Sequence, residues 1–276
     1  MEKLQAALAR AREKRENDGR PVRRTEPVSR RGARRAAQEN EVAARWSALA
    51  QFEPSTKHMQ KMHIYADKAT SEAQHFDILR TKLLLEMRRN DWTRIAITSA
   101  TPGCGKTTTA CNLIAGLGRQ QELRGMLFDL DFRRPSVTKV LGEEAPHSFA
   151  AVLADEVPFS EHAMRWHDNT CISMTNKVVS DPARLILRSR TLEIIDTIQD
   201  EYRPHLMLFD TPPVMVSDET RGFLKNVDAV LIMAAADSTT VAQVDAVERE
   251  VAQYTNVAGI VLNKCRFLEQ DYGYSY

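Results

Sequence analysis

Residues 100–107 read A-T-P-G-C-G-K-T and lie between an apolar stretch that predicts a strand and a run that predicts a helix. A glycine-rich loop in that setting is typical of a phosphate-binding (Walker A) loop. Gly103 and Gly105 allow backbone N–H groups to surround phosphate oxygens, and the helix N-terminus adds partial positive charge. We expect Lys106 to reach the β- and γ-phosphates and the Thr107 hydroxyl to contact Mg²⁺. The candidate nucleotide-binding residues are Pro102, Gly103, Cys104, Gly105, Lys106, Thr107 and Thr108.

Strand-like and helix-like runs alternate along most of the chain. Strands are predicted at 94–100, 125–130, 171–175, 206–210, 229–235 and 257–262. Helices are predicted at 70–89, 106–121, 182–200, 218–224 and 240–254. Apolar strands between amphipathic helices predict an α/β fold, a parallel β-sheet sandwiched by helices, as in P-loop NTPases. Ligands of such sheets bind at the carboxyl ends of the strands.

Charge is distributed unevenly along the chain. The totals, 38 Lys or Arg against 37 Asp or Glu, give no reason to expect a nucleic-acid partner. Residues 1–50, however, hold 13 basic and 7 acidic side chains. We expect residues 1–54 to be a flexible or partly helical basic extension, with helical pieces at 2–17 and 34–52. Docking to a partner chain or to anionic lipid is the alternative role for its arginines.

Cysteine spacing and hydropathy indicate the compartment. The four cysteines show neither close pairing nor metal-type spacing, which is typical of a reducing cytosol. No run approaches the roughly 18 apolar residues that a membrane helix needs, and no signal peptide is recognisable. We therefore expect a cytoplasmic protein that reaches a membrane only through another chain.

Acidic residues follow two of the predicted strands. Asp129 and Asp131 are expected on the same side of one strand exit, facing the phosphate-binding loop, with Arg133 able to neutralise phosphate charge. Asp210 ends another buried apolar run, a position typical of the second carboxylate of P-loop ATPases. Such carboxylates hold Mg²⁺ through water or accept a proton from an attacking hydroxyl. The candidate catalytic residues are Lys106, Asp129, Asp131 and Arg133, and the candidate metal site is Thr107, Asp131 and Asp210.

Tyrosines are concentrated at the end of the sequence. Tyr272, Tyr274 and Tyr276 alternate with small or polar residues, a pattern with no helical period and no capacity to form a core. A terminal segment of this kind suits a phosphate acceptor that must reach an active site. We expect residues 269–276 to be a phosphorylated tail and residues 55–268 to be the P-loop domain.

These motifs together resemble the bacterial tyrosine kinases of polysaccharide export (BY-kinases). The motifs are A-T-P-G-C-G-K-T, L-F-D-L-D-F-R-R-P, L-F-D-T-P-P-V and V-L-N-K, within residues 60–276. The resemblance implies an ATP- and Mg²⁺-dependent autokinase in which Asp129 activates the tyrosine hydroxyl while Asp131 and Asp210 organise Mg²⁺. It also implies that the tyrosine tail is phosphorylated in trans and that the chain regulates exopolysaccharide or capsule synthesis and export.

The family also suggests partners. This sequence resembles the split form of the family, a cytoplasmic chain held at the inner face of the membrane by an integral-membrane polysaccharide co-polymerase. A cognate tyrosine phosphatase and a homo-oligomer are further expected partners. Members carry an E-x-x-R-x-x-R helix that builds a ring, but here Gln74 and Asp77 replace its first two charged residues and only Arg80 remains. The ring form is therefore in question.

Asn263 ends the last predicted strand, where it either contacts adenine or caps the strand. Two rival functions are a positioning ATPase of the partition or division-site type and a non-catalytic ATP-binding scaffold. Positioning ATPases carry a signature lysine where this chain has Thr101, and the tyrosine tail has no role in them. The intact carboxylates argue against the scaffold.

Overall fold

The computed structural model describes residues 28–265, with side chains from residue 32. The chain divides into two units, residues 1–41 and 42–276, and helix α2 (Val28–Ala48) crosses the boundary. The larger unit thus begins well before residue 55, because Val42, Trp46 and Phe52 are buried in its core. The indole Nε1 of Trp46 donates to the carbonyl oxygen of Tyr202 at 2.8 Å, which fixes the end of α2 to this unit. The predicted helix at 2–17 and the tail at 269–276 lie outside the described residues.

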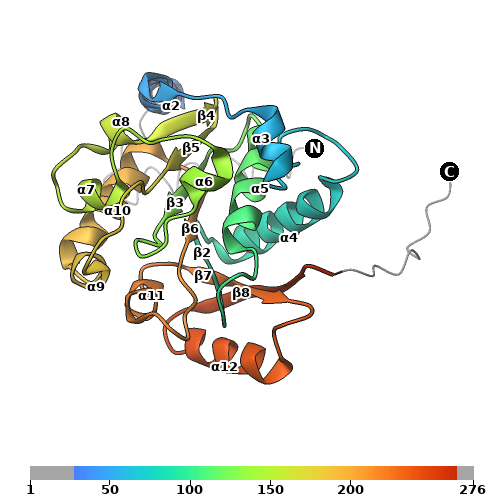
Figure 1. The fold of residues 1–276 in the computed structure, drawn as a ribbon. Helices are drawn as coiled ribbons and strands as arrows, with labels where there is room; N and C mark the ends of the chain where they lie inside the picture. The colour runs from blue at the N-terminus through green and yellow to red at the C-terminus, as the bar shows by residue number, and fades with distance from the viewer. Residues whose placement is uncertain (1–27, 266–276) are drawn as a thin grey trace, which may run out of the picture. The chain divides into compact units, whose positions relative to one another are not determined.

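One sheet organises the larger unit (Figure 1). Its strand order is β1-β4-β5-β3-β6-β2-β7-β8. All neighbouring pairs are parallel except β4 and β5, which are antiparallel. The strands are β1 (Ala50–Gln51), β2 (Arg94–Ser99), β3 (Gly125–Asp129), β4 (Met164–His167), β5 (Thr170–Ser173), β6 (Leu206–Asp210), β7 (Ala229–Ala235) and β8 (Asn256–Asn263).

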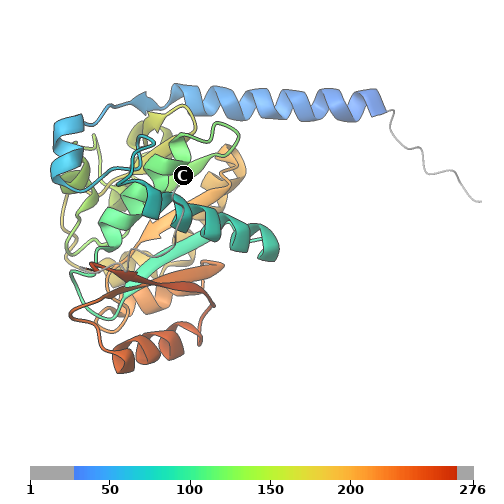
Figure 2. The same ribbon diagram turned by 90° about the vertical axis from the view of Figure 1, so that its right-hand side faces the viewer.

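Helices cover both faces of this sheet. On one face the core includes side chains of α3 (Thr56–Lys61), α4 (Gln74–Asn90), α5 (Lys106–Gly118) and α6 (Val137–Leu141). On the other face lie the end of α2 and α7 (Phe149–Leu153), α8 (Phe159–His162), α9 (Pro182–Ile186), α10 (Ser189–Tyr202), α11 (Asp218–Leu224) and α12 (Val241–Val251). Figure 2 shows α12 running beside β8 at one end of the sheet. The predicted α/β fold with a helix-covered, mostly parallel sheet is confirmed.

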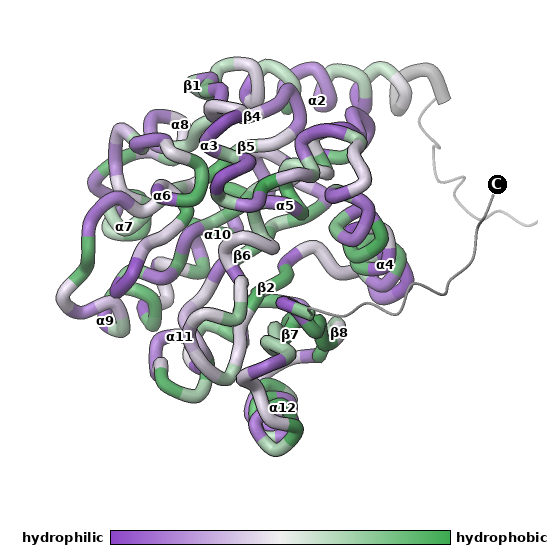
Figure 3. The backbone as a smooth tube through the Cα atoms, turned by 45° about the vertical axis from the view of Figure 1, so that its right-hand side comes forward, coloured by the Kyte–Doolittle hydropathy of each residue, from purple (hydrophilic) through white to green (hydrophobic). Residues whose placement is uncertain are grey.

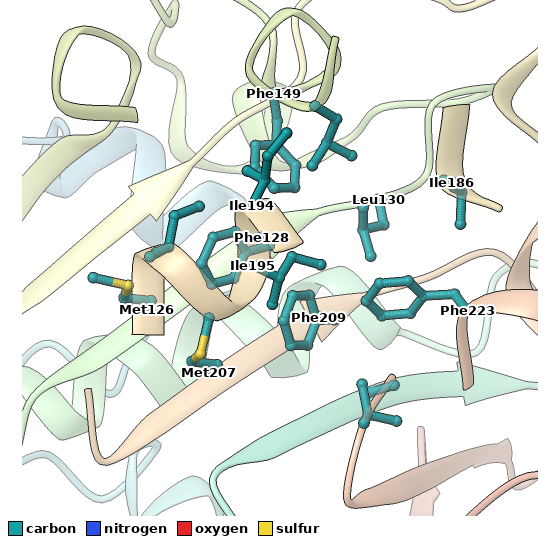
Figure 4. Packing of buried hydrophobic residues seen from close by; sticks show 14 of the residues in the cluster. Met126, Phe128, Leu130, Phe149, Ile186, Ile194, Ile195, Met207, Phe209 and Phe223 are labelled. Atoms are coloured by element: carbon teal, nitrogen blue, oxygen red, sulfur yellow. The ribbon is translucent and has the colours of Figure 1, made fainter. Parts of the chain in front are cut away.

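Aromatic rings fill the second of these interfaces (Figure 4). The rings of Phe128 on β3 and Phe209 on β6 are stacked with centroids 4.9 Å apart, and Phe223 of α11 meets Phe209 edge-on at 5.1 Å. Each such ring contributes roughly 1.5–3 kcal/mol through burial. Figure 3, coloured by hydropathy, shows that β2, β7 and β8 themselves consist largely of hydrophobic residues. The apolar side chains from which the strands were predicted therefore also pack the helices against the sheet.

Differences from the predicted elements have local causes. All six predicted strands are present, but the short β1 and β4 at one side of the sheet were not predicted. The predicted helix at 182–200 is two helices, because Arg188 adopts an extended backbone between them. There the Thr191 hydroxyl donates to the Leu185 carbonyl at 2.7 Å, which satisfies an acceptor that a continuous helix would have paired.

Asp77 of α4 forms ion pairs within the chain. Its carboxylate accepts from Arg80 at 2.7 Å and also from Arg119. The Arg80 guanidinium in turn donates to the carbonyl of Gly116 at 2.7 Å, which ties α4 to α5. The residue that departs from the ring-forming motif therefore stabilises the packing of two helices.

We expect acid to destabilise the fold through His162. This side chain is fully buried, and its ring nitrogens lie 3.1 Å from the His147 carbonyl and 2.8 Å from the Ser173 hydroxyl. Burial lowers the pKa of His162 to about 4. The unfolded chain binds this proton near pH 6.5, so stability from His162 is complete above pH 6.5 and is lost as the pH falls to 4.

The size of this loss is about 3 kcal/mol, because each unit of pKa shift corresponds to about 1.4 kcal/mol. The measurement is the free energy of unfolding in urea, for the wild type and His162→Gln, at several pH values from 7 to 4. The wild type should lose more stability than the variant over this range. Parallel losses would assign the acid sensitivity to other groups.

Candidate functional site

The carboxyl ends of the parallel strands form one edge of the sheet, and the phosphate-binding loop lies there. The loop follows β2 and leads into α5, which begins at Lys106. Gly103 and Gly105 have φ angles of +80° and +88°, in the left-handed region that favours glycine. A Cβ on Gly105 would lie 2.2 Å from Nδ2 of Asn263, so this position has no space for a side chain.

Asn263 holds the loop from the end of β8. Its Nδ2 donates to the carbonyl oxygen of Cys104 at 2.9 Å. The Cys104 side chain is buried, with Sγ 3.3 Å from the Thr101 carbonyl. Burial alone would raise the pKa of Cys104, but hydrogen bonds from Thr101, Thr239 and Ser99 outweigh it and lower the pKa. Both side chains thus hold the backbone of the loop in place.

A cavity of about 750 Å³ lies in front of the loop. A volume of this size accommodates a nucleotide. The predicted residues that line it are Pro102, Gly103, Gly105, Lys106, Thr107, Thr108, Asp131 and Arg133. Asp129, Asp210, Cys104 and Asn263 are not among the residues that line it. The structure therefore brings the predicted loop residues and one of the three carboxylates together around one space.

Lys106 places a buried positive charge beside the cavity. Its side chain is 8% exposed, and its Nζ donates to the Ser99 hydroxyl at 3.3 Å. This hydrogen bond to a hydroxyl does not neutralise the ammonium, and Lys106 lines the cavity. Its positive charge lowers the pKa values of Asp131 and Asp210, against the stronger effect of burial.

Thr107 and Asp210 fit a magnesium site. The Thr107 hydroxyl donates to Oδ2 of Asp210 at 2.5 Å and lies 2.8 Å from the Ser136 hydroxyl. The other carboxylate oxygen of Asp210 is buried and has no hydrogen-bond partner among the described residues. Burial raises the pKa of Asp210 to about 6. A buried, unsatisfied oxygen beside a hydroxyl suits Mg²⁺, which takes oxygen ligands and keeps most of its waters.

Asp129 is enclosed at the neighbouring strand end. Its Cα is paired in register with that of Asp210, and its side chain is fully buried. One oxygen accepts from the backbone N–H of Asp131 at 3.2 Å, and the other accepts from Ser136 and Val137 at 3.2 and 3.1 Å. Burial, and then the charge of Asp210, raise the pKa of Asp129 well above its usual range. Asp129 thus organises the segment that follows β3.

Asp131 is the carboxylate at the cavity surface. It is partly buried, and Oδ1 accepts from the backbone N–H of Arg134 at 2.9 Å. Burial raises the pKa of Asp131. A carboxylate of raised pKa that borders a phosphate site is suited to accept a proton.

Arg133 lies at the rim of the cavity and is paired. Its Nε donates to Oε1 of Glu219 at 2.6 Å, and Glu219 is 1% exposed. This ion pair fixes Arg133 beside α11, so it is less available to a phosphate than the sequence suggested. Glu219 and Ser136 were missed because neither belongs to a recognisable motif, and only the fold brings them to the site.

The tyrosines Tyr272, Tyr274 and Tyr276 lie outside the described residues. Among the helices that are described, none combines the length and apolar character required to cross a bilayer.

Comparison with known proteins identifies the family. Residues 95–269 match the model of the CobQ/CobB/MinD/ParA nucleotide binding domain. The putative tyrosine-protein kinase AmsA of Erwinia amylovora is 28% identical over 199 residues, which cover 71% of this chain and 27% of AmsA. The tyrosine-protein kinase YwqD of Bacillus subtilis is 24% identical over 206 residues, 73% of this chain and 85% of YwqD.

The fold agrees with these relatives. The kinase domain of the Escherichia coli tyrosine kinase ETK superposes with a TM-score of 0.66 at 23% identity, over 75% of this chain and 82% of that domain. The chain spans about a quarter of the length of AmsA. The resemblance to bacterial tyrosine kinases is confirmed by these relatives, and the predicted nucleotide-binding domain by the family match. The chain belongs to the CobQ/CobB/MinD/ParA nucleotide-binding domain family, with relatives among the bacterial tyrosine-protein kinases.

Proposed function

We propose that this protein is an ATP-dependent protein-tyrosine kinase that phosphorylates Tyr272, Tyr274 and Tyr276 on a second copy of the chain. The observation that supports this most is the position of Asp131, which borders the same cavity as the phosphate-binding residues Lys106 and Thr107. Hydrolysis of ATP would require only a group that positions a water molecule, whereas transfer to tyrosine also requires a group that accepts the phenolic proton. A carboxylate of raised pKa at an open cavity surface suits an incoming hydroxyl.

In the proposed reaction the tyrosine oxygen forms a bond to the γ-phosphorus of ATP while the bond to the β–γ bridging oxygen breaks. The phenolic proton passes to a carboxylate, and ADP leaves. Lys106 and the loop N–H groups stabilise the charge on the transferred phosphoryl group. Thr107, Asp131 and Asp210 would hold Mg²⁺, which would supply charge neutralisation for the phosphates of ATP.

The proton acceptor is one of two neighbouring carboxylates. The resemblance assigns this role to Asp129, whereas the enclosure of Asp129 and the open position of Asp131 favour Asp131. Asp129 would then act by positioning the segment that carries Asp131.

We also propose that the kinase acts in exopolysaccharide or capsule production, at the inner face of the membrane, bound to an integral-membrane co-polymerase. A tyrosine phosphatase would reverse the modification. The names of the relatives support the kinase activity. The family also contains positioning ATPases, as its MinD and ParA members indicate, so this second function must be tested directly.

Incubating the full chain with Mg-ATP and mapping phosphate by mass spectrometry separates these functions. We expect phosphotyrosine at Tyr272, Tyr274 and Tyr276. Tyr254, which follows α12, is the internal control. It is 40% exposed, but its hydroxyl donates to Glu250, so it should remain unphosphorylated. Transfer in trans predicts a rate per molecule that rises with protein concentration. Phosphate release without phosphotyrosine would indicate the positioning ATPase. The absence of both free phosphate and phosphotyrosine would indicate the scaffold.

A further inference from the structure

The nucleotide cavity carries more positive charge than the phosphate-binding loop requires. Besides Lys106, its lining includes Arg133, Arg134, Lys139 and Lys264, whereas among the described residues Asp131 is the one carboxylate that lines it. Mg-ATP carries roughly two net negative charges, and the loop N–H groups and Lys106 already address its phosphates. The remaining cations are therefore available to a second, anionic ligand.

Two of these cations lie on the segment that runs from Asp131 to α6, and neither forms an ion pair in the described part of the chain. Arg133 is held by Glu219, whereas the exposed side chains of Arg134 and Lys139 form no ion pair among the described residues. The charge of Arg134 acts on Asp131 and partly offsets the rise of its pKa. The backbone N–H of Arg134 is 2.9 Å from Oδ1 of Asp131, which places its guanidinium within one side-chain length of that carboxylate. Lys139 belongs to α6, which begins directly after Ser136, the neighbour of the Thr107 hydroxyl.

The spacing of the tail tyrosines matches such an arrangement. Tyr272, Tyr274 and Tyr276 occupy alternate positions, so in an extended segment they project from one side about 7 Å apart. When one tyrosine is opposite Asp131, a neighbour two residues away comes within reach of Arg134. A phosphate on that neighbour adds about −1.5 to −2 charges. Asp271 and Glu269 supply weaker negative charge in the same segment.

We propose that Arg134 and Lys139 form an anion subsite that selects tyrosines flanked by a carboxylate or, more strongly, by a phosphotyrosine two residues away. This inference rests on the proposed kinase function and specifies its acceptor. Phosphorylation of one tail tyrosine then makes the tail a better substrate for the next transfer. The modification is self-reinforcing until the cluster is full.

The test uses three synthetic peptides of residues 266–276 as substrates of the full-length chain. One has the natural sequence, one carries phosphotyrosine at Tyr274, and in the third Glu269 and Asp271 are replaced by Gln and Asn. The measured quantity is the ratio of kcat/KM between peptides, obtained separately for each protein. The neutral peptide is thus an internal reference for any effect on ATP or on folding.

For the wild type we expect the phosphorylated peptide to exceed the neutral peptide about tenfold, with the natural peptide between them. In the variant Arg134→Glu with Lys139→Glu the order should reverse, and Arg134→Gln should give an intermediate ratio. Charge reversal at Arg88 and Arg249, exposed on helices outside the cavity, is the matched control and should keep the wild-type ratio. Raising the salt concentration should reduce the preference.

Equal kcat/KM for all peptides in the wild type, or a preference that survives charge reversal, would overturn the subsite while leaving the kinase intact. Phosphotyrosine on no peptide and on no tail would remove the kinase function, and the subsite with it.

Discussion

Replacing Lys106 by Met should reduce phosphotyrosine formation by about 10²–10³-fold, because it removes the buried cation that stabilises the transferred phosphoryl group. Methionine fills a similar volume, and Lys106 has one hydrogen bond, to Ser99, among the described residues. The fold should therefore be retained, and the loss should appear in kcat as well as in nucleotide affinity. The measurement is the initial rate of phosphotyrosine formation with Mg-ATP, together with nucleotide binding by calorimetry.

Lys82→Met is the matched control, since Lys82 is an exposed lysine on α4 and does not line the cavity. It should leave the rate within about twofold of the wild type, as surface substitutions generally do. A Lys106→Met protein that keeps a third or more of the wild-type rate would show that the loop is not the phosphate site.

Substituting the two carboxylates at the end of β3 should give different combinations of lost activity and lost stability. Asp131→Asn should lower phosphotyrosine formation by about 10²–10⁴-fold with little change in the melting temperature, because this carboxylate lies at the cavity surface. Asp129→Asn should lower both. Both oxygens of Asp129 accept backbone N–H groups, so an amide would direct its own N–H₂ at one of them, at a cost of about 1–3 kcal/mol.

The pH dependence separates the roles of the two residues. A proton acceptor in the reaction contributes an ionisation to the pH profile of kcat, and this ionisation should disappear in Asp131→Asn but persist in the residual activity of Asp129→Asn. The opposite result would assign proton transfer to Asp129, as the resemblance to the family implies. Asp168→Asn, at an exposed carboxylate beside β5, controls for removal of a charge.

The sequence predicted those parts of the site that depend on local geometry. The glycines with positive φ and the start of α5 at Lys106 follow from the order of residues, and so do the strand ends at Asp129 and Asp210. Each is a property of a single strand–loop–helix unit, which short-range patterns describe well.

What the sequence did not predict depends on contacts between distant segments. Whether Asp129 or Asp131 faces the cavity is decided by the backbone of residues 131–137, which folds over Asp129 and donates to it. Arg133 forms an ion pair with Glu219, which lies 86 residues further along the chain. Trp46 joins the core because Tyr202, at the C-terminal end of α10, accepts its indole N–H and packs against its ring, and no pattern in a polar, arginine-rich stretch indicates this.

Asn263 links nucleotide binding to the local stability of the sheet. β8 is one of the two edge strands and pairs on one side only, so its fraying costs less free energy than that of an inner strand. Yet its last residue donates to the carbonyl of Cys104 in the phosphate-binding loop. When this strand end frays, the loop loses that contact, so a nucleotide that requires the ordered loop must oppose fraying. Bound nucleotide should therefore slow hydrogen exchange at the end of β8, and fraying of this strand end should in turn weaken nucleotide binding.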